Sequence, residues 1–438
     1  MLNSALGLQR TPPTDGRRPL SQQRRKARSI FRRWRDLSFR HTWVNPLVLL
    51  LILLSGYAYN PSPSNPLHHA LFLSYPLPRD PTAPSSTPIQ YGKGPQDFTF
   101  VAFYTVVLSF TREFLMQIVI RPLAVRCGIR GRAKQSRFME QMYTAVYFLF
   151  LGPFGLYVMS RTPIWYFNTT GFFNDFPHKT HEGVFKAYYL FQAAYWAQQA
   201  IVLMLQLEKP RKDFRELVWH HIVTLSLIWS SYRFHFTYMG LAVYITHDIS
   251  DFFLATSKCL NYLDSPIVGP YFGLFVFVWV YMRHIINLRI LYATLTEFST
   301  VGPFELNWET QQYKCRLSQT IAFTLLASLQ AVNLFWMFLI LRIAKNYVFD
   351  KALDDDRSDV EDYADEEVEE NERRPRAAST AKADLTPNGN GIVKLLVNGE
   401  PVRGEANGSA VMDDGDDDGE PETQYRVLVA EVEKKKDR

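Results

Sequence analysis

Two adjacent histidines and two nearby aspartates stand inside apolar stretches of this chain, where ionisable side chains are rare. His220 and His221 lie in FRELVWHHIVTLSLIWSSYRF, and Asp248 and Asp251 lie in the following stretch, TYMGLAVYITHDISDFFLATSK. A charged side chain is costly in hydrocarbon, so such residues usually face a polar interior. Paired imidazoles and carboxylates can exchange protons or form covalent intermediates. The four residues therefore predict an acid–base or nucleophilic site within the membrane.

Helical spacing predicts that these residues meet at one depth. Each stretch is long enough to cross a bilayer as a helix, which needs about 20 mostly apolar residues. If the outer ends of both helices lie on one side, His220 and Asp251 are each roughly 10 Å below that surface. Asp248 and Asp251 are three residues apart and share a helix face. His247 and Ser250 lie beside them and are candidate supporting residues.

Each of these residues also has a structural explanation. A single intramembrane histidine is commonly a hydrogen-bonding residue between helices, and a single aspartate is often half of a structural pair. The set of four at matched depth favours function. Metal binding is a separate alternative, but a di-iron membrane oxygenase needs several spaced histidine boxes. No metal site is predicted, because such boxes are missing and His41, His68, His69, His178 and His181 lie outside the apolar segments.

The sequence from Trp219 to Leu263 resembles the signature of the ceramide synthases, the sphingoid-base N-acyltransferases of the TLC-domain superfamily. The adjacent histidines, an H-D-x-x-D pattern and a following S-K-x-x-N-Y are all present. The stretches TREFLMQIVIRPLA, YYLFQAAYWAQQ and EKPRKDF also fit, and the resemblance, which is fungal-like, covers roughly residues 97–346. It implies an all-α polytopic membrane protein in which six of about eight transmembrane helices form a barrel around an intramembrane tunnel.

The resemblance also implies a reaction, transfer of a fatty acyl group from acyl-CoA to the amine of a sphingoid base, giving ceramide or dihydroceramide. No cofactor is implied, because acyl-CoA is a substrate. The residues alone leave two routes open: a histidine attacks the thioester, or it acts as a base on the sphingoid ammonium. The resemblance favours an acylated His220, with His221 as base or orienting residue and Asp248 and Asp251 holding the imidazoles. A non-catalytic TLC-type lipid transporter or sensor is the alternative function.

Composition and loop charge predict the membrane topology. The 438 residues are 47% hydrophobic, and three cysteines cannot build a disulfide framework. The basic loops 121–137 and 208–214 are expected in the cytosol, and the Pro-rich loop 60–96 in the lumen. Asn168 begins a glycosylation sequon in loop 161–182, which also requires the lumen. Eight apolar segments are predicted to span the membrane: 43–59, 98–120, 138–160, 184–206, 215–233, 238–257, 267–292 and 316–346.

The chain is expected to divide into a basic cytosolic tail (1–40), a first transmembrane helix with a lumenal loop (41–96), a TLC catalytic domain (97–346) and a disordered acidic cytosolic tail (347–438). An even number of spans places both tails in the cytosol. The basic tail has neither a signal-peptide pattern nor a DNA-binding fold, so nucleic acid is not a predicted partner. The acidic tail carries Ser358 in a casein-kinase-type context. It ends in KKDR, which resembles a dilysine retrieval signal and predicts the endoplasmic reticulum membrane.

Cations near the predicted cytosolic mouth are candidates for binding the phosphates of acyl-CoA. Lys258 directly follows the H-D-x-x-D helix, and Lys209, Arg211 and Lys212 lie in the basic loop before the histidines. Topogenic charge or contact with anionic lipid explains the same residues equally well.

Charged and amide side chains in the other apolar segments are interpreted mainly as structural. Arg112, Glu113, Arg283 and His284 are expected to pair with residues on other helices, with a place in the reaction chamber as the alternative. A polar cavity could be lined by Gln192, Trp196, Gln198 and Gln199, although hydrogen bonding between helices is the usual role of glutamine there. Beyond the two substrates, the expected partners are membrane lipid, a small single-span accessory subunit and a second copy of the chain.

Overall fold

The part of the chain that the structure describes is mostly helical. The chain forms two compact units, residues 1–373 and 374–438. In the second unit, β3 (Leu396–Val397) pairs antiparallel with β4 (Glu400–Pro401). Ser358 lies outside the described residues. The computed structural model describes residues 33–38, 40–79, 81–82, 84, 86–208, 212–350, 396–397 and 400–401.

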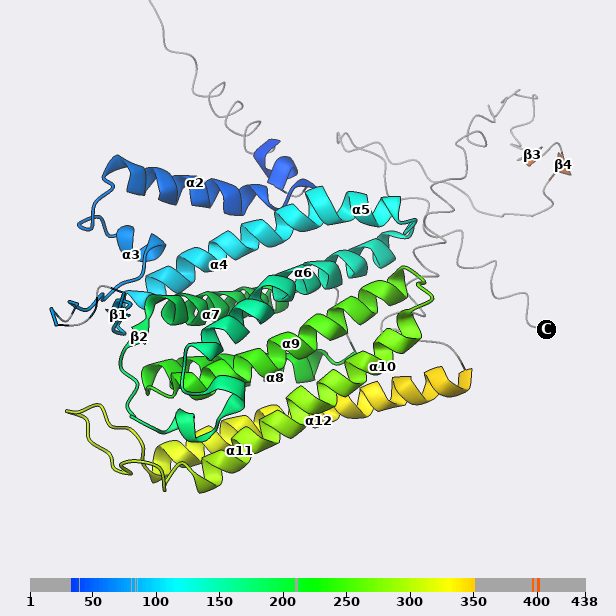
Figure 1. Cartoon of the computed structure of the whole chain (residues 1–438). Helices are drawn as coiled ribbons and strands as arrows, with labels where there is room; N and C mark the ends of the chain where they lie inside the picture. Colours follow the sequence, from blue (N-terminus) through cyan, green and yellow to red (C-terminus); the bar gives the residue numbers. More distant parts are fainter. Residues whose placement is uncertain are drawn as a thin grey trace, which may run out of the picture. The chain divides into compact units, whose positions relative to one another are not determined.

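Helices of the first unit coincide with all eight predicted apolar segments (Figure 1). Two of these segments contain a π-helical turn, η1 or η4, which joins consecutive α-helices. In chain order the helices are α2 (Val44–Tyr59), α3 (His68–Leu71), α4 (Asp97–Phe114), η1 (Leu115–Ile120), α5 (Arg121–Arg126), α6 (Arg132–Ser160), the 3₁₀ turns η2 (Trp165–Phe167) and η3 (Thr170–Phe172), α7 (Gly183–Met204), α8 (Phe214–Arg233), α9 (Thr237–Tyr262), α10 (Val268–Trp279), η4 (Val280–Ile286), α11 (Asn287–Thr296) and α12 (Arg316–Asp350).

Four helical stretches among the described residues are long and apolar enough to cross a membrane. They are Asp97–Arg126, Arg132–Ser160, Val268–Thr296 and Arg316–Phe349. The protein is therefore a mostly helical chain with several candidate membrane spans. Helices α8 and α9 have 20 and 26 residues, but they also carry the polar side chains of the candidate site, which lower their hydropathy.

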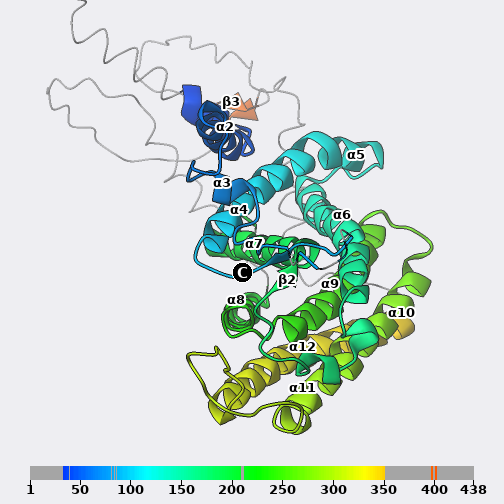
Figure 2. The ribbon, with the colours of Figure 1, turned by 60° about the vertical axis from the view of Figure 1, so that its left-hand side comes forward.

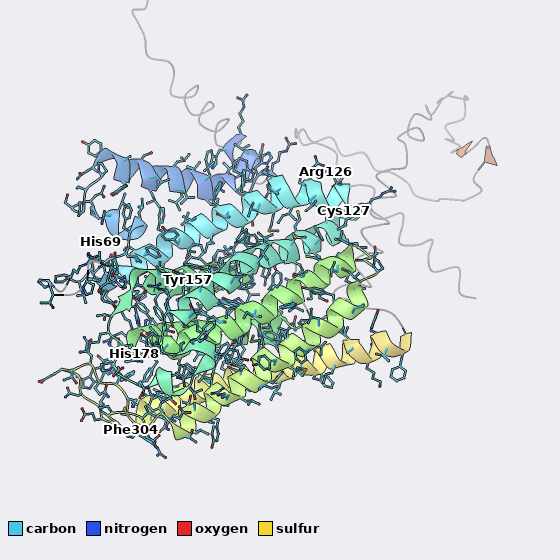
Figure 3. The ribbon with its side chains drawn as sticks, in the orientation of Figure 1. His69, Arg126, Cys127, Tyr157, His178 and Phe304 are labelled. Carbon is cyan, nitrogen blue, oxygen red and sulfur yellow. The ribbon has the colours of Figure 1, made fainter. Side chains whose placement is uncertain are left out.

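Loops gather at the two ends of the helices. A short antiparallel pair of strands, β1 (Gln90–Tyr91) and β2 (His181–Glu182), joins the loop before α4 to the loop before α7. Figure 3 shows His69 and Phe304 at the same end of the first unit, with Cys127 at the opposite end. The loop 60–96 and the basic loop 121–137, which the charge pattern assigns to opposite sides of the membrane, thus lie at opposite ends of the helices.

Helices α8 and α9 are held by neighbours on several sides. Helix α9 packs on α6 and α10, while α8 packs on α7 and α12, and Figure 2 shows α7 and α8 next to each other. Glycines allow close approach to α7, because a Cβ on Gly155 would lie 2.4 Å from the Tyr188 hydroxyl and one on Gly240 2.3 Å from the Tyr189 hydroxyl. The chain thereby brings the polar faces of α7, α8 and α9 together.

Candidate active site

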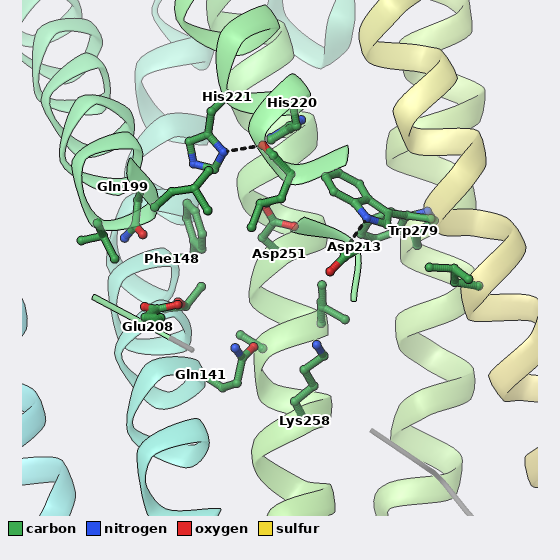
Figure 4. Close-up of a pocket in the computed structure, with 18 of the residues that line it drawn as sticks. Gln141, Phe148, Gln199, Glu208, Asp213, His220, His221, Asp251, Lys258 and Trp279 are labelled. Atoms are coloured by element: carbon green, nitrogen blue, oxygen red, sulfur yellow. Dashed lines mark hydrogen bonds between the residues drawn. The ribbon is translucent and has the colours of Figure 1, made fainter. Parts of the chain in front are cut away.

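A polar chamber of about 260 Å³ lies among α6, α7, α8, α9, η4 and α12. Figure 4 shows His220 and His221 entering it from α8, and Asp251 and Lys258 from α9. Four residues that the sequence analysis singles out therefore border one cavity. Its other polar lining residues include Gln141, Thr144, Gln199, Glu208, Asp213 and Arg283.

The two histidines are buried and differ in their hydrogen bonds. His220 is 4% exposed and His221 9%, and their ring centroids lie 5.7 Å apart. His221 Nδ1 lies 2.9 Å from the Leu217 carbonyl oxygen. A carbonyl oxygen only accepts, so Nδ1 carries the proton and Nε2 is the basic nitrogen of the neutral ring. His220 Nε2 lies 3.5 Å from Thr224 Oγ1, and its Nδ1 has no hydrogen-bond partner among the described residues.

Asp251 forms an ion pair with Arg283 at the chamber wall. The guanidinium also donates to Ser250 Oγ at 2.7 Å and to Asn333 Oδ1 at 3.0 Å. The Arg283 side chain is 2% exposed and that of Asp251 19%, so the carboxylate is the more open partner. Arg283 stands in the π-helical turn η4, a feature frequent at functional sites. The expected interhelical partner is present, and the structure adds that Arg283 lines the chamber.

Asp248 is placed differently from Asp251. It is fully buried and does not line the chamber. Among the described residues its hydrogen bonds come from α7, from the Tyr188 hydroxyl at 3.0 Å and from the Gln192 amide. The carboxylate therefore contacts α7 rather than a histidine. Gln192 also accepts a hydrogen bond from Tyr147, so it connects three helices.

The candidate supporting residues lie next to the histidine pair. The His247 ring centroid is 6.5 Å from that of His220, in a stacked orientation. His247 Nδ1 donates to the Val243 carbonyl at 2.9 Å, the same arrangement as in His221. Ser250 donates to backbone carbonyls of its own helix and accepts from Arg283. Ser250 thus fixes the guanidinium that pairs with Asp251.

Of the four candidate phosphate-binding cations, the structure describes Lys258 and Lys212, which lie in different surroundings. Lys258 lines the chamber. Lys212 is exposed and does not line it. Lys209 and Arg211 lie outside the described residues.

Sequence analysis misses two acidic residues at the chamber mouth. Glu208 pairs with Arg112, which also pairs with Glu113, so the partners of Arg112 lie in the loop after α7 and on its own helix rather than on another helix. Asp213 accepts a hydrogen bond from Trp336 Nε1 at 3.0 Å. Both acids belong to the stretch EKPRKDF, whose cations dominate its charge. The negative charge of these two residues beside an apolar segment was the signal that could have identified them.

A small apolar cavity of about 50 Å³ lies on the other side of His220. His220 and Trp196 line both this cavity and the polar chamber. The remaining walls of the small cavity come from α7, α8, α9 and α12 and include Leu227, Val243 and Leu329. His220 therefore stands between a chamber that holds many polar side chains among apolar ones and a smaller cavity that is almost entirely apolar.

A second polar cluster lies at the end of the bundle that holds β1 and β2. The Lys93 ammonium lies 2.8 Å from the His178 carbonyl oxygen and 3.3 Å from His235 Nδ1. Burial, reinforced by the charge of Lys93, lowers the pKa of His235 to about 3. Burial also lowers the pKa of Lys93, with the charge of Lys186 adding to the effect. Lys93 and His235 also line a cavity of about 680 Å³ between α4, α7 and α8, away from the chamber that holds the histidine pair.

Two further expectations concern the surface and metals. Asn168 is exposed, and its Nδ2 donates to the Pro163 carbonyl at 3.2 Å. Within the described part of the chain, no group of three or more His, Cys, Asp or Glu side chains is placed to hold a metal ion.

Known proteins resemble this chain over most of its length. Residues 137–342 match the TLC domain model. The chain is 49% identical over 345 residues to ceramide synthase LAG1 of Saccharomyces cerevisiae, covering 78% of this chain and 82% of that protein. It is 48% identical over 344 residues to sphingosine N-acyltransferase lac1 of Schizosaccharomyces pombe, covering 78% and 88%. It is 50% identical over 343 residues to sphingosine N-acyltransferase-like protein FUM17 of Gibberella moniliformis, covering 77% and 88%.

These matches define a multi-pass membrane protein with a TLC domain. The chain belongs to the fungal ceramide synthase family. It is an N-acyltransferase whose substrates are an acyl-CoA and a sphingoid base, which confirms the family and the reaction expected from the sequence.

Proposed function

We propose that this ceramide synthase transfers its acyl group at His220, with His221 and Asp251 as its partners in the chamber. The observation that carries the proposal is that His220 lines both the polar chamber and the apolar cavity. An acyl-CoA has a polar handle on one side of its thioester and hydrocarbon on the other. Burial of a hydrocarbon chain is favourable by about 0.8 kcal/mol per CH₂. The thioester carbon therefore belongs at such a boundary.

In the first step, a ring nitrogen of His220 attacks the thioester carbon. An N–C bond forms, the C–S bond breaks, and coenzyme A leaves as a thiolate that takes up a proton. The product on the enzyme is an acyl-imidazole. The His220 Nδ1 without a hydrogen-bond partner supports this role, because a nucleophilic nitrogen needs an available lone pair.

In the second step, the amine of the sphingoid base attacks the acyl carbon of the acyl-imidazole. A new amide N–C bond forms, the bond to His220 breaks, and the amine loses a proton. His221 is the proposed acceptor, because its Nδ1–H donates to the Leu217 carbonyl and its Nε2 is therefore basic. Asp251 lines the same chamber and favours the imidazolium that results.

The other predicted residues take supporting roles in this proposal. Asp248 holds α9 against α7 through Tyr188 and Gln192. His247 stacks near His220. Lys258 is the proposed contact for a phosphate of acyl-CoA, because it is the predicted cation that lines the chamber.

The proposed setting is the endoplasmic reticulum membrane, with eight spans, six of them in a TLC-type barrel, and both tails in the cytosol. Support comes from the eight helical segments and from the basic loops at one end of the bundle. A glycan on Asn168 is compatible with its exposure. A single-span accessory subunit and a second copy of the chain remain proposed partners.

The test is a membrane assay with sphinganine and a panel of acyl-CoAs, comparing wild type with His220→Ala. His69→Ala, at the opposite end from the basic loops, is the matched control. The expected result is loss of ceramide formation in His220→Ala at normal protein level, together with loss of a hydroxylamine-sensitive acyl-enzyme. Product formation by His220→Ala at the normal rate would overturn the site. Retained lipid transfer by a wild-type protein that forms no ceramide would favour the transporter alternative.

A further inference from the structure

A second apolar cavity, of about 680 Å³, lies between α4, α7 and α8. We call it the lateral cavity. Tyr189 and Ile228 line both the lateral cavity and the small cavity beside His220. One layer of side chains therefore separates the two. Most of the lateral lining is hydrocarbon, contributed by Phe98, Val101, Leu190, Ala193, Ala197 and Leu225.

Tyr189 forms the main part of this partition. The residue is 1% exposed, and its hydroxyl is hydrogen-bonded to Ser231 on α8. Gly240 on α9 leaves room for the hydroxyl, because a Cβ there would lie 2.3 Å from it and 3.0 Å from Ser231 Oγ. This hydrogen bond and ring contacts with Phe185, Tyr232 and Tyr244 hold the ring between the two cavities.

The cavity beside His220 is too small for an acyl chain, and the larger cavity lies one layer of side chains further away. The cavity at His220 has about 50 Å³, roughly the space of one or two water molecules. An acyl chain of many methylene groups cannot fit there. The lateral cavity next to it is more than ten times larger, at about 680 Å³. A chain anchored at His220 reaches that space if the Tyr189 ring moves aside.

We propose that the lateral cavity receives the distal part of a long acyl chain held at His220, and that Tyr189 is a specificity-determining residue at its entrance. The inference rests on the proposed function, because it needs the acyl carbon at His220. It assigns a binding site for hydrocarbon outside the chamber where the reaction takes place.

The polar end of the lateral cavity favours an acyl chain over a sphingoid base as the occupant. Lys93 and Arg233 line that end. Asp97 lines it too, but its carboxylate pairs with Lys186 at 2.7 Å and accepts from Tyr232 at 2.7 Å. A sphingoid ammonium would therefore meet the Arg233 guanidinium, the Lys93 amine and an engaged carboxylate. The same polar groups would stop a hydrocarbon chain and so limit its length.

The test fills the lateral cavity from its far side. Ala193→Phe and Ala197→Phe add a ring on the α7 face that lines only this cavity. Val184→Phe, at an exposed position on the same helix, is the matched control. We expect kcat/KM for hexacosanoyl-CoA to fall about tenfold relative to palmitoyl-CoA in the filled variants. The control should keep the wild-type ratio.

The ratio between two acyl-CoAs on one variant cancels any loss of folded protein. An equal loss at both lengths, or an unchanged ratio in both filled variants, would overturn the proposal. A raised KM for sphinganine at every acyl length would also overturn it, because the sphingoid chain would then occupy the cavity. Inactivity of His220→Ala remains a separate result on the proposed function.

The partition itself is tested by Tyr189→Phe and Ser231→Ala. Each removes the hydrogen bond while leaving the ring in place. Both variants should shift the ratio toward hexacosanoyl-CoA, and the double variant should equal the singles because both remove the same bond. A shift toward palmitoyl-CoA, or additive effects in the double variant, would contradict a gating role for Tyr189.

Discussion

Two of the buried carboxylate–cation pairs among the described residues are built differently. Asp97 and Lys186 are 3% and 1% exposed as side chains, and the ammonium also donates to the carbonyls of Ser74 and Gly92. Asp251 pairs with Arg283 but is 19% exposed and borders the 260 Å³ chamber. The first pair fastens the loop before α4 to α7. The second presents a carboxylate to a chamber. The open volume beside an ion pair is therefore the feature that distinguishes a candidate functional pair from a purely structural one.

The largest expected effect is on activity, in Asp251→Asn. The amide keeps the size of the side chain but loses the charge that favours an imidazolium in the chamber. We expect kcat to fall by about 10²–10⁴-fold, measured as ceramide formed per folded enzyme. Asp264→Asn, 82% exposed and paired with Lys134, should keep full activity. A kcat within twofold of wild type in Asp251→Asn would remove Asp251 from the mechanism.

The Asp97–Lys186 pair should give the opposite pattern. Asp97→Asn leaves a buried ammonium without its counter-charge, which typically costs about 3–5 kcal/mol. The melting midpoint in detergent should fall by roughly ten degrees, while activity per folded enzyme is retained at low temperature. Adding Lys186→Met should restore part of the loss. An unchanged midpoint with lost activity would place this pair in the catalytic machinery instead.

A smaller effect is expected for Lys258, the cation at the chamber. Lys258→Met should raise KM for acyl-CoA about tenfold through loss of a charge-assisted hydrogen bond, with kcat little changed. Lys134→Met, at the same end of the bundle, is the control. Dependence of KM on salt should weaken in Lys258→Met only. A KM equal to that of the control would mean that Lys258 does not contact the phosphates.

The smallest expected effect is a loss of thermal stability at acidic pH, caused by His235. Burial lowers the pKa of His235 to about 3, against about 6.5 in an unfolded chain. As pH falls below about 6.5 the unfolded state takes up the proton first, so stability present at neutral pH is lost toward pH 3. The midpoint should drop by several degrees between about pH 7.5 and 5.5. His235→Gln should drop less, although buried His178 and His181 also have a lowered pKa. Equal drops would contradict the assignment.

Sequence alone predicts the helices and the histidine pair well, because apolar runs and adjacent ionisable residues are local signals. It does not predict that Asp248 and Asp251 separate. Three residues on a helix are displaced by about 60° around its axis, enough for Asp251 to border the chamber while Asp248 faces α7. Which of the two faces which neighbour depends on how α9 is rotated in the bundle. That rotation is set by long-range packing, including the glycine contacts with α7.

The contacts of Arg283 also depend on long-range packing that the sequence does not reveal. Its charge inside an apolar segment signals a partner, but the partner lies 32 residues away in the chain. The π-helical turn that carries Arg283 has no sequence signature comparable with a proline or glycine. The sequence therefore offers a place in the chamber for Arg283 only as the less favoured alternative to a structural pair.

The hydrogen bond between His221 Nδ1 and the Leu217 carbonyl limits which mutations can disturb the orientation of His221. Histidines that act in proton transfer often receive their orientation from a carboxylate, which a single mutation can remove. Here the main chain one turn earlier supplies it, and no side-chain replacement at Leu217 abolishes a carbonyl. The position of the proton depends instead on the regularity of α8. A substitution that bends this turn, such as a proline within it, would separate the imidazole from the carbonyl and release the proton from Nδ1.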